Sequence, residues 1–578
     1  MKPSRFAVPF FLAVLLVLGA AVVGVPAAQA QDVQVTSADP PAAEQGTINL
    51  DVTVKGKGFK NGAQAKWFVT GTTNPGGVTV NSTAFISGSE LRANITVADD
   101  ATIANFDIVV TNTNGRSGKG TELFRVTQKG SGGGNATSCV IPAPALTTTQ
   151  SCSSTLPGCL DTTFGGTGSV SVDSDGLPGS TDADGGQAVA IQPDGKIVVV
   201  GTGGSYSNGS GDWVALRLHM DGALDISFGN GGMTIIRVSG ATDEVSSVFL
   251  QPDGKILVAG SSGGAYFAVA RLDVNGILDA GFGSGGITTI NFGLKGGGQA
   301  QGIALQSDGK IVLAGGGRGA DWSIARLNSN GSLDTSFGNK GLVIAKSGGG
   351  PAYAVRMQWV TVNGTPVERI LVAGRGWSAS NVDFGLMRFT LAGALDATFG
   401  LGGSGKTFTD FCAQMGEFTR TIEFDASGNI VAAGMINMGG SGFTGYNFVI
   451  ARYTPNGLLD TTFGETLPNQ TQPSGRTIVD FLAGYDSHRG MAIQPDGRIL
   501  LSGTIQNTAE TYSAVGLVRF NPDGSVDTSF GNNGMVAASL GTQDAGLKLA
   551  RDGYGRFLVA GQSLINGERD ISVFRFWH

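Results

Sequence analysis

The sequence predicts an all-β protein, in which a seven-bladed β-propeller of about 60-residue repeats follows an N-terminal β-sandwich. The first observation is a repeated hairpin: AVAIQPDGKIVVVG (188–201) returns as VFLQPDGKILVAG (248–260), IALQSDGKIVLAG (303–315) and MAIQPDGRILLSG (491–503). An Asp-Gly pair between two apolar runs is a strong hairpin signal. The second observation is 94 glycines in 578 residues without a Gly-X-Y period, which is typical of turns between many short strands.

Residues 1–30 have the pattern of a signal peptide. Lys2 and Arg5 precede an apolar run over residues 6–25, and small residues at Ala28 and Ala30 fit a cleavage site. The alternative is a transmembrane anchor, because the run is close to the roughly 20 residues that a membrane span needs. We expect cleavage, no membrane span afterwards, and a secreted or cell-surface protein, with the periplasm as an open alternative.

Residues 31–128 alternate apolar and polar side chains over about seven short runs, which predicts a small β-sandwich. Leu91, Ala93, Ile95 and Val97 illustrate the alternation. The segments TVKGKGFKNGAQAKWF (53–68), SELRANITV (89–97) and FDIVVTNTNGRSG (106–118) resemble the immunoglobulin-like IPT/TIG family of extracellular modules. The resemblance implies an immunoglobulin fold that serves as a spacer or a protein-contact module.

Residues 129–159 have the Gly, Ser, Thr and Pro content of a linker. Cys139, Cys152 and Cys159 lie in it, and Cys412 lies further along the chain. In an exported chain these cysteines favour disulfides over zinc or a nucleophile, because no CxxC spacing or histidine pairing accompanies them. If all four bond, three pairings are open.

The repeat array covers residues 160–578. An apolar strand that ends in glycine occurs seven times, and so does a Phe-Gly step, with spacings from 54 to 67 residues. Repeats of this size with four short strands each are typical of propeller blades rather than of helical solenoids.

A charged pair recurs in the array and indicates how the ring closes. In six repeats an arginine is followed eight residues later by an aspartate, which predicts a structural clasp across a turn. Arg575 lacks its aspartate and Asp161 lacks its arginine, so we expect the start of the array to supply the outer strand of the last blade. Closure removes exposed strand edges. The six complete pairs are Arg217 and Asp225, Arg271 and Asp279, Arg326 and Asp334, Arg388 and Asp396, Arg452 and Asp460, and Arg519 and Asp527.

The segments QPDGKILVAG (251–260) and AVARLDVNGILDAGFGSGG (268–286) resemble the delta-60 repeat family of bacterial exported proteins. The resemblance implies a propeller fold and export, with no activity attached. The order of strands and turns is also similar to that of NHL propellers, which implies that the first strand of each repeat is innermost.

Composition argues against several function classes. The net charge is −7, which removes the electrostatic term that nucleic-acid binding needs. The three histidines do not assemble into a catalytic triad or a metal cluster with neighbouring motifs, so no catalytic residue is predicted. We expect His488, in YDSHRG, to be a loop residue.

Two weaker patterns indicate candidate sites. Asp173, Asp175, Asp182 and Asp184 form an oxygen-rich stretch that could hold calcium, the only cofactor the sequence suggests, although Asp-Gly is first a turn signal. The second pattern is charge in the first strand of three repeats, at Arg356, Glu423 and Lys548. If that strand is innermost, the three residues line the central channel, either as a polar ligand site or as ion pairs that fill it.

Taken together, these patterns predict an exported non-enzymatic binding or scaffold protein that presents a propeller face to a carbohydrate or protein partner at the cell surface. Two alternatives stay open. One is an exported lyase or hydrolase that acts on a polysaccharide, and the other is a purely structural component of the envelope or matrix. The oligomeric state cannot be read from these patterns.

Overall fold

The computed structural model describes residues 33–98, 100–127, 156–174, 184–203, 211–293, 298–316, 321–348, 350–377, 382–411, 416–437, 445–466, 473–482, 484–507 and 509–578. The predicted signal peptide lies outside these residues. The chain divides into two compact units, Met1–Lys129 and Gly130–His578. Nearly all regular structure in the described residues is β, with one 3₁₀ turn at Leu401–Gly403. None of the described helical segments has the length and apolarity to cross a membrane.

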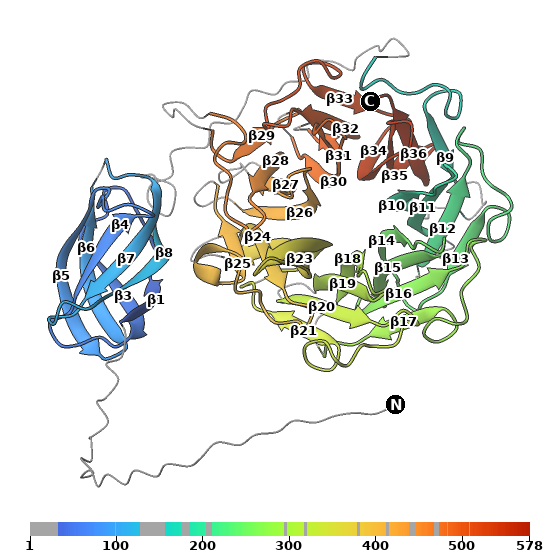
Figure 1. Cartoon of the computed structure of the whole chain (residues 1–578). Coiled ribbons are helices and arrows are strands. Elements are labelled where there is room, and N and C mark those ends of the chain that lie inside the picture. Colours follow the sequence, from blue (N-terminus) through green and yellow to red (C-terminus); the bar gives the residue numbers. More distant parts are fainter. Residues whose placement is uncertain are drawn as a thin grey trace, which may run out of the picture. The chain divides into compact units, whose positions relative to one another are not determined.

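The N-terminal unit consists of two four-stranded sheets, with strand orders β1-β3-β6-β5 and β2-β8-β7-β4 (Figure 1). All pairings are antiparallel except that of β2 with β8. The strands are β1 (Gln34–Asp39), β2 (Ala42–Glu44), β3 (Leu50–Lys57), β4 (Gln64–Val69), β5 (Val78–Ser87), β6 (Glu90–Val97), β7 (Ala104–Thr111) and β8 (Ser117–Thr127).

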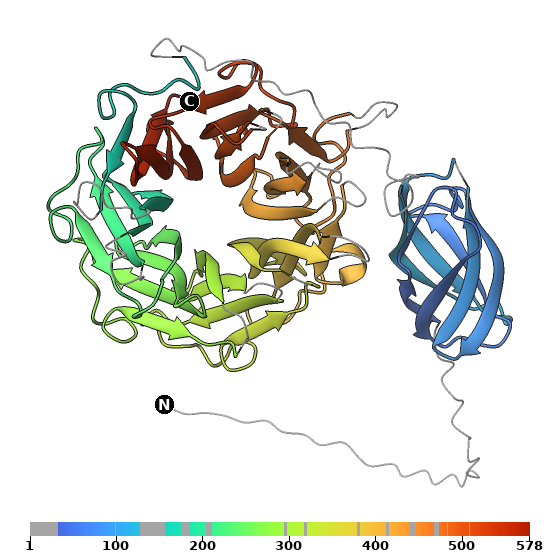
Figure 2. The ribbon, with the colours of Figure 1, turned by 180° about the vertical axis from the view of Figure 1, so that it is seen from behind.

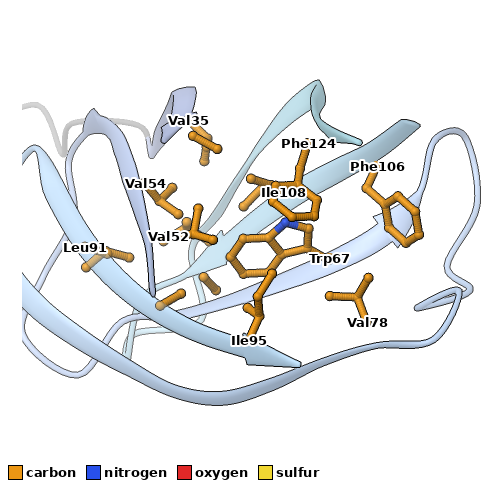
Figure 3. Packing of buried hydrophobic residues seen from close by; sticks show 14 of the residues in the cluster. Val35, Val52, Val54, Trp67, Val78, Leu91, Ile95, Phe106, Ile108 and Phe124 are labelled. Atoms are coloured by element: carbon orange, nitrogen blue, oxygen red, sulfur yellow. The ribbon is translucent and has the colours of Figure 1, made fainter. Parts of the chain in front are cut away.

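One core lies between these two sheets. Val52, Leu91 and Ile95 come from the first sheet, while Trp67 and Phe124 come from the second and meet edge to face at 5.9 Å (Figure 3). The alternation read at residues 91–97 is present in the structure, since the odd-numbered side chains are fully buried. Burial of apolar area on one face of each sheet holds the unit together.

The second unit is a ring of seven four-stranded sheets (Figures 1 and 2). The innermost strands are β10 (Gly185–Ile191), β14 (Val245–Leu250), β18 (Gln299–Leu305), β22 (Ala352–Val362), β26 (Glu417–Phe424), β30 (Ser487–Ile493) and β34 (Asp544–Arg551). The second strands are β11 (Ile197–Gly203), β15 (Ile256–Ser262), β19 (Ile311–Gly316), β23 (Thr365–Trp377), β27 (Ile430–Asn437), β31 (Ile499–Gln506) and β35 (Phe557–Ile565).

The third strands are β12 (Asp212–Leu218), β16 (Tyr266–Leu272), β20 (Trp322–Leu327), β24 (Val382–Phe389), β28 (Tyr446–Tyr453), β32 (Ser513–Phe520) and β36 (Glu568–Phe576). The outer strands are β13 (Met233–Ile236), β17 (Ile287–Ile290), β21 (Leu342–Ala345), β25 (Lys406–Thr409), β29 (Arg476–Val479), β33 (Met535–Ala538) and β9 (Ser169–Val172). Apolar clusters join side chains of adjacent sheets, so the core of the ring lies between blades.

The ring closes through its first strand. β9 pairs antiparallel with β36, from Val172 opposite Ile571 to Ser169 opposite Phe574. The contacts begin before residue 160, because Gly158 donates to the carbonyl of Trp577 and Pro157 accepts from Gly531. Residues 156–159, which were expected in the linker, therefore belong to the ring. Cys159 forms a disulfide, and the other three cysteines lie outside the described residues.

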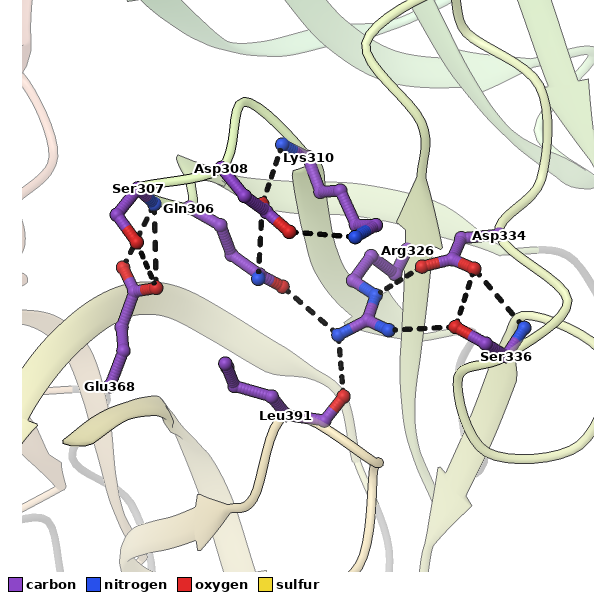
Figure 4. Close-up of polar contacts among 9 residues, drawn as sticks. All are labelled: Gln306, Ser307, Asp308, Lys310, Arg326, Asp334, Ser336, Glu368 and Leu391. Carbon is purple, nitrogen blue, oxygen red and sulfur yellow. Dashed lines mark hydrogen bonds and ion pairs between the residues drawn. The ribbon is translucent and has the colours of Figure 1, made fainter. Parts of the chain in front are cut away.

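Each predicted arginine–aspartate pair forms an ion pair in the structure, and each arginine does more than pair. In the third blade, Arg326 Nε lies 2.8 Å from Asp334, and the guanidinium donates to the Leu391 carbonyl of the next blade (Figure 4). The same guanidinium covers the Phe337 ring at 4.7 Å. The seven Nε–carboxylate distances lie between 2.7 and 2.9 Å. The clasp thus stabilises the contact between blades as well as the turn within one.

Five of the clasp aspartates carry a second cation that sequence reasoning missed. It directly precedes the second strand in four blades and lies within β23 in the fourth blade: Lys196 with Asp225, Lys255 with Asp279, Arg369 with Asp396, Arg498 with Asp527, and Arg556 with Asp161. In the second blade, hydrogen bonds from Lys255 and from the Gly281 N–H, opposed by burial, lower the pKa of Asp279 to about 2.

The lowered pKa of Asp279 predicts an acid-dependent loss of stability. The folded pKa lies below the unfolded one, so the contribution is complete above about pH 4 and is lost as the pH falls through about 2. We expect Asp279→Asn to be less stable than the wild type at pH 5, with the difference shrinking between pH 4 and pH 2. Urea unfolding at both ends of this range measures it, and a difference that is independent of pH would contradict it.

Candidate functional site

Every innermost strand contains a β-bulge at one position. The pairing register between the first and second strands shifts by one residue, for example between Thr419 and Thr421 in β26. A shift occurs at the equivalent place in β10, β14, β18, β22, β30 and β34. A bulge turns its extra residue out of the regular alternation and re-aims the side chain. The residues at the seven bulges are Gln187, Ser246, Gln301, Tyr353, Arg420, Arg489 and the pair Leu547–Lys548.

A glycine within the second strand makes room for the bulge, and the strand continues past it. A Cβ on Gly434 would lie 2.0 Å from the Phe418 carbonyl oxygen, and one on Gly315 would lie 1.8 Å from that of Gln299. The equivalent glycines of the other five blades face the backbone of the inner strand in the same way: Gly201, Gly260, Gly374, Gly503 and Gly561. The recurrent glycine of IVVVG and ILVAG is therefore required by the backbone at the bulge.

All seven bulges line one cavity of about 320 Å³ at the centre of the ring. Glutamines dominate one side of the lining, at Gln187, Gln299, Gln301 and Gln562. The side formed by β22, β26, β30 and β34 carries Tyr353, Arg420, Arg489 and Lys548. A second cavity of about 420 Å³ continues from it and shares Gln301, Tyr353 and Lys548. A concave site with a few convergent polar groups is the usual form of a small-ligand site.

Aromatic rings hold one arginine of this cavity, Arg420. The Arg420 guanidinium carbon lies 4.0 Å from the Tyr353 ring centroid and 5.1 Å from that of Phe418, while Arg375 covers the Phe418 ring at 4.4 Å. Burial, and then the neighbouring Arg489, lower the pKa of Arg420 to about 9, so it stays cationic at pH 7. Stacking fixes the guanidinium plane and leaves N–H groups available for other partners.

Of the three predicted channel residues, two neutralise each other. Arg356 lies 2.5 Å from Glu423, which corresponds to the ion-pairing alternative. Lys548 does line the cavity, but it does not occupy the strand position of Arg356 and Glu423. In β34 that position belongs to Ala550, because Ala550 pairs with Leu558 as Glu423 pairs with Val431 in β26. The Asp552-Gly553 pair does not form the Asp-Gly turn between β34 and β35. The turn glycine with a positive φ is Gly555, two residues later.

His488 is not a loop residue, and this expectation was wrong. It lies in β30, is fully buried, and its Nε2 is 2.7 Å from the Thr421 hydroxyl beside the second cavity. Burial, with Lys548, Arg420 and Arg489 adding to it, lowers the pKa of His488 well below its usual range. His488 is therefore neutral at pH 7 and packs behind the basic side of the cavity.

The calcium candidates are only partly described. Asp184 is buried and accepts from the Ser174 N–H at 2.7 Å, Asp173 is also described, and Asp175 and Asp182 lie outside the described residues. Among the residues that the structure covers, no group of three or more metal-ligating side chains gathers.

Sequence reasoning missed six bulge residues as site residues: Gln187, Ser246, Gln301, Tyr353, Arg420 and Arg489. A signal exists, because each lies five positions before a fixed place in the repeat. In five blades this place is the first residue of the turn, at Gln192, Gln251, Gln306, Asp425 and Gln494, and in the fourth blade it is Gln358 within the longer strand β22. The opposing glycine marks the same place in the sheet.

Six segments of the chain match the family model described as "Domain of unknown function (DUF5122) beta-propeller": residues 192–228, 251–282, 306–337, 369–399, 426–463 and 494–530. The ring is a β-propeller. Each match begins at or near the turn between the first two strands and ends at the phenylalanine of the Phe-Gly step, so the model covers the parts of the six matched blades that carry the clasp.

Several solved structures are similar to the propeller. One is described as a polysaccharide lyase, an ulvan lyase, at 11% identity over 69% of this chain and 95% of that chain, with a TM-score of 0.34. Another is the β-propeller domain of the trilobed protease from Pyrococcus furiosus, at 9% identity over 68% and 93%, with a TM-score of 0.33. A third is an α-L-arabinofuranosidase from Fusarium graminearum, at 8% identity over 71% and 97%, with a TM-score of 0.36. No curated protein matches the chain.

Proposed function

We propose that this protein is an exported, non-enzymatic binding protein whose propeller takes a carbohydrate in its central cavity. The proposal includes the finer family assignments: delta-60 repeats in the ring and an IPT/TIG-like module over residues 31–128 that acts as spacer or second contact. The observation that carries it is the alignment of seven bulges on one cavity. A purely scaffolding ring has no need to re-aim one side chain in every blade.

The chemistry of the lining favours a polyhydroxylated ligand over an apolar one. The amide of a glutamine offers both donors and an acceptor, which suits the hydroxyl groups of a sugar. Gln299 and Gln301 form a pair in which Gln301 Nε2 lies 2.5 Å from Gln299 Oε1, and Gln299 in turn donates to Glu244 at 3.2 Å. These contacts orient the amides toward the cavity in advance.

The same cavity also supports a second candidate, a polysaccharide lyase. A lyase that acts on uronate needs a base for the proton next to the carboxylate, an acid for the leaving oxygen, and cations for the carboxylate. Burial and the neighbouring arginines lower the pKa of Lys548 to about 7, so its amine is a base of suitable strength, and Tyr353 would be the acid. Turnover is therefore measured together with binding.

The test is a binding screen of the purified chain against neutral and acidic oligosaccharides. We expect saturable, competable binding, weakened about tenfold by Gln301→Ala, because one or two hydrogen bonds are lost. Exposed Gln64 on β4 provides the control, since Gln64→Ala should bind as the wild type does. Absorbance of an unsaturated product would favour the lyase, and no binding to any glycan would favour a protein partner or a structural role.

A further inference from the structure

Resting on the proposed carbohydrate function, we propose that Arg420, Arg489 and Lys548 form an anion subsite, which binds a carboxylate or sulfate group of the sugar. The three side chains come from bulges in three consecutive innermost strands, β26, β30 and β34. They converge on the cavity of about 320 Å³ that the bulges surround. The ligand class is thereby narrowed to acidic, polyhydroxylated carbohydrate.

The three cations lack the carboxylates that the clasp arginines possess. In the part of the chain that the structure describes, Arg420, Arg489 and Lys548 form no ion pair. Among the described residues that line the cavity, Glu244 is the only one with a carboxylate, and it accepts from Gln299. The adjacent acid, Glu423, is held by Arg356. The lining therefore carries an excess of positive charge.

The hydrogen-bonding state of Arg420 also indicates a missing partner. Its Nε is buried and, among the described residues, has no hydrogen-bond acceptor. Leaving a buried charged donor unpaired costs free energy, so such groups are normally satisfied. The rings of Tyr353 and Phe418 contact the Arg420 guanidinium and fix its plane. Its N–H edge can therefore donate two parallel hydrogen bonds to a carboxylate or a sulfate.

The three like charges repel one another, and a bound anion would relieve the repulsion. Burial first, and then Arg356, Arg489 and Arg420, lower the pKa of Lys548 to about 7, with Glu423 acting in the opposite direction. The other titratable groups that face it are Tyr353 on β22, neutral His488 on β30, and Glu244, which directly precedes β14. Lys548 is thus cationic below about pH 7 and neutral above, so affinity for an anion falls as the pH rises.

The remainder of the lining explains why the ligand is a sugar acid and not a bare ion. Gln187, Gln301 and Gln562 lie on the same cavity as the cations and offer neutral donors and acceptors. An anion fixed on the basic side would place attached hydroxyls against these amides. Galacturonate and sulfated galactose both have this combination, and they differ in the charged group.

The experiment compares three oligosaccharides of equal length by calorimetry on the purified chain: oligogalacturonate, a sulfated galactan fragment and a neutral galactan fragment, with inorganic sulfate as a fourth probe. We expect at least one charged oligosaccharide to bind tenfold or more tightly than the neutral one. The preference should weaken severalfold from pH 6 to pH 8. The double variant Arg420→Gln, Arg489→Gln should lose the preference and keep the neutral binding.

A matched control is Arg237→Gln, because Arg237 is 78% exposed directly after the outer strand β13, away from the cavity, and should leave all four affinities unchanged. Melting curves of the double variant establish that the ring is intact. Equal affinity for charged and neutral fragments would overturn the anion subsite and leave the proposed function standing. Sulfate binding that the double variant abolishes, with no sugar bound, would support the subsite while the proposed function fails. No binding of any probe would overturn both.

Discussion

Replacing Asp161 with alanine will lower the free energy of unfolding of the ring by about 3–5 kcal/mol, the usual cost of removing one partner from a buried ion pair. The Asp161 side chain is fully buried and lies 2.8 Å from Arg575 and 3.2 Å from Arg556. Without the carboxylate, two nearly buried guanidiniums lose their counter-charge. The same change loosens the closure, where the beginning of the array meets its end.

The matched control is Asp279→Ala, the same position in the second blade. The Asp279 side chain is 17% exposed and its second cation, Lys255, is 33% exposed, so water compensates part of the loss. Urea unfolding of both variants gives the comparison. The prediction is contradicted if Asp161→Ala costs no more than Asp279→Ala, because closure would then contribute nothing beyond an ordinary clasp.

Replacing Gly434 with alanine will displace the bulge that carries Arg420. The new Cβ would lie 2.0 Å from the Phe418 carbonyl oxygen, a distance that real side chains do not reach, so β26 must move away from β27. We expect a loss of about 1–3 kcal/mol of stability, the usual cost of overpacking. We also expect oligogalacturonate binding to weaken more than tenfold, because the guanidinium no longer meets the cavity at the same angle.

Gly416 supplies the control on the same blade, directly before β26. A Cβ added to Gly416 would meet no atom within 4 Å, and its φ is not positive, so Gly416→Ala should preserve both stability and binding. Calorimetry and thermal melting of the pair separate the two effects. Normal oligogalacturonate affinity in Gly434→Ala would show that the bulge does not position Arg420.

The architecture of the ring follows from the sequence because its contacts are local and repeated. Arg326 and Asp334 stand eight residues apart, so their pairing depends on one turn, and the same spacing in six repeats makes it recognisable. Arg575 and Asp161 are the only members of the pattern without a partner eight residues away, so the sequence predicts that they pair with each other, as they do. Residues 156–159 could not be assigned in this way because no charge or repeat marks them, although Pro157 takes part in a contact between blades.

The site is harder to predict because it depends on the register between strands. Arg420 interrupts the alternation of β26, and only its spacing of five residues before Asp425 distinguishes it from a surface arginine. The opposing glycine, Gly434, marks the bulge, but a single glycine carries little information in a chain that contains 94 of them. The sequence placed Lys548 on the channel because Asp552-Gly553 resembles the Asp-Gly turns of the other repeats. The turn of this blade lies two residues later, at Gly555.

The pairing of β9 with β36 also sets an order on synthesis. β9 is translated before six complete blades, and its partner is translated after them. Blades assemble as they emerge, but the seventh waits for the last strand, and until then β9 offers an unpaired edge. A chain truncated before β36 would therefore keep most of its blades and still expose the unpaired edge of β9. Truncated chains would be open to proteolysis at this strand, whereas full-length chains would not.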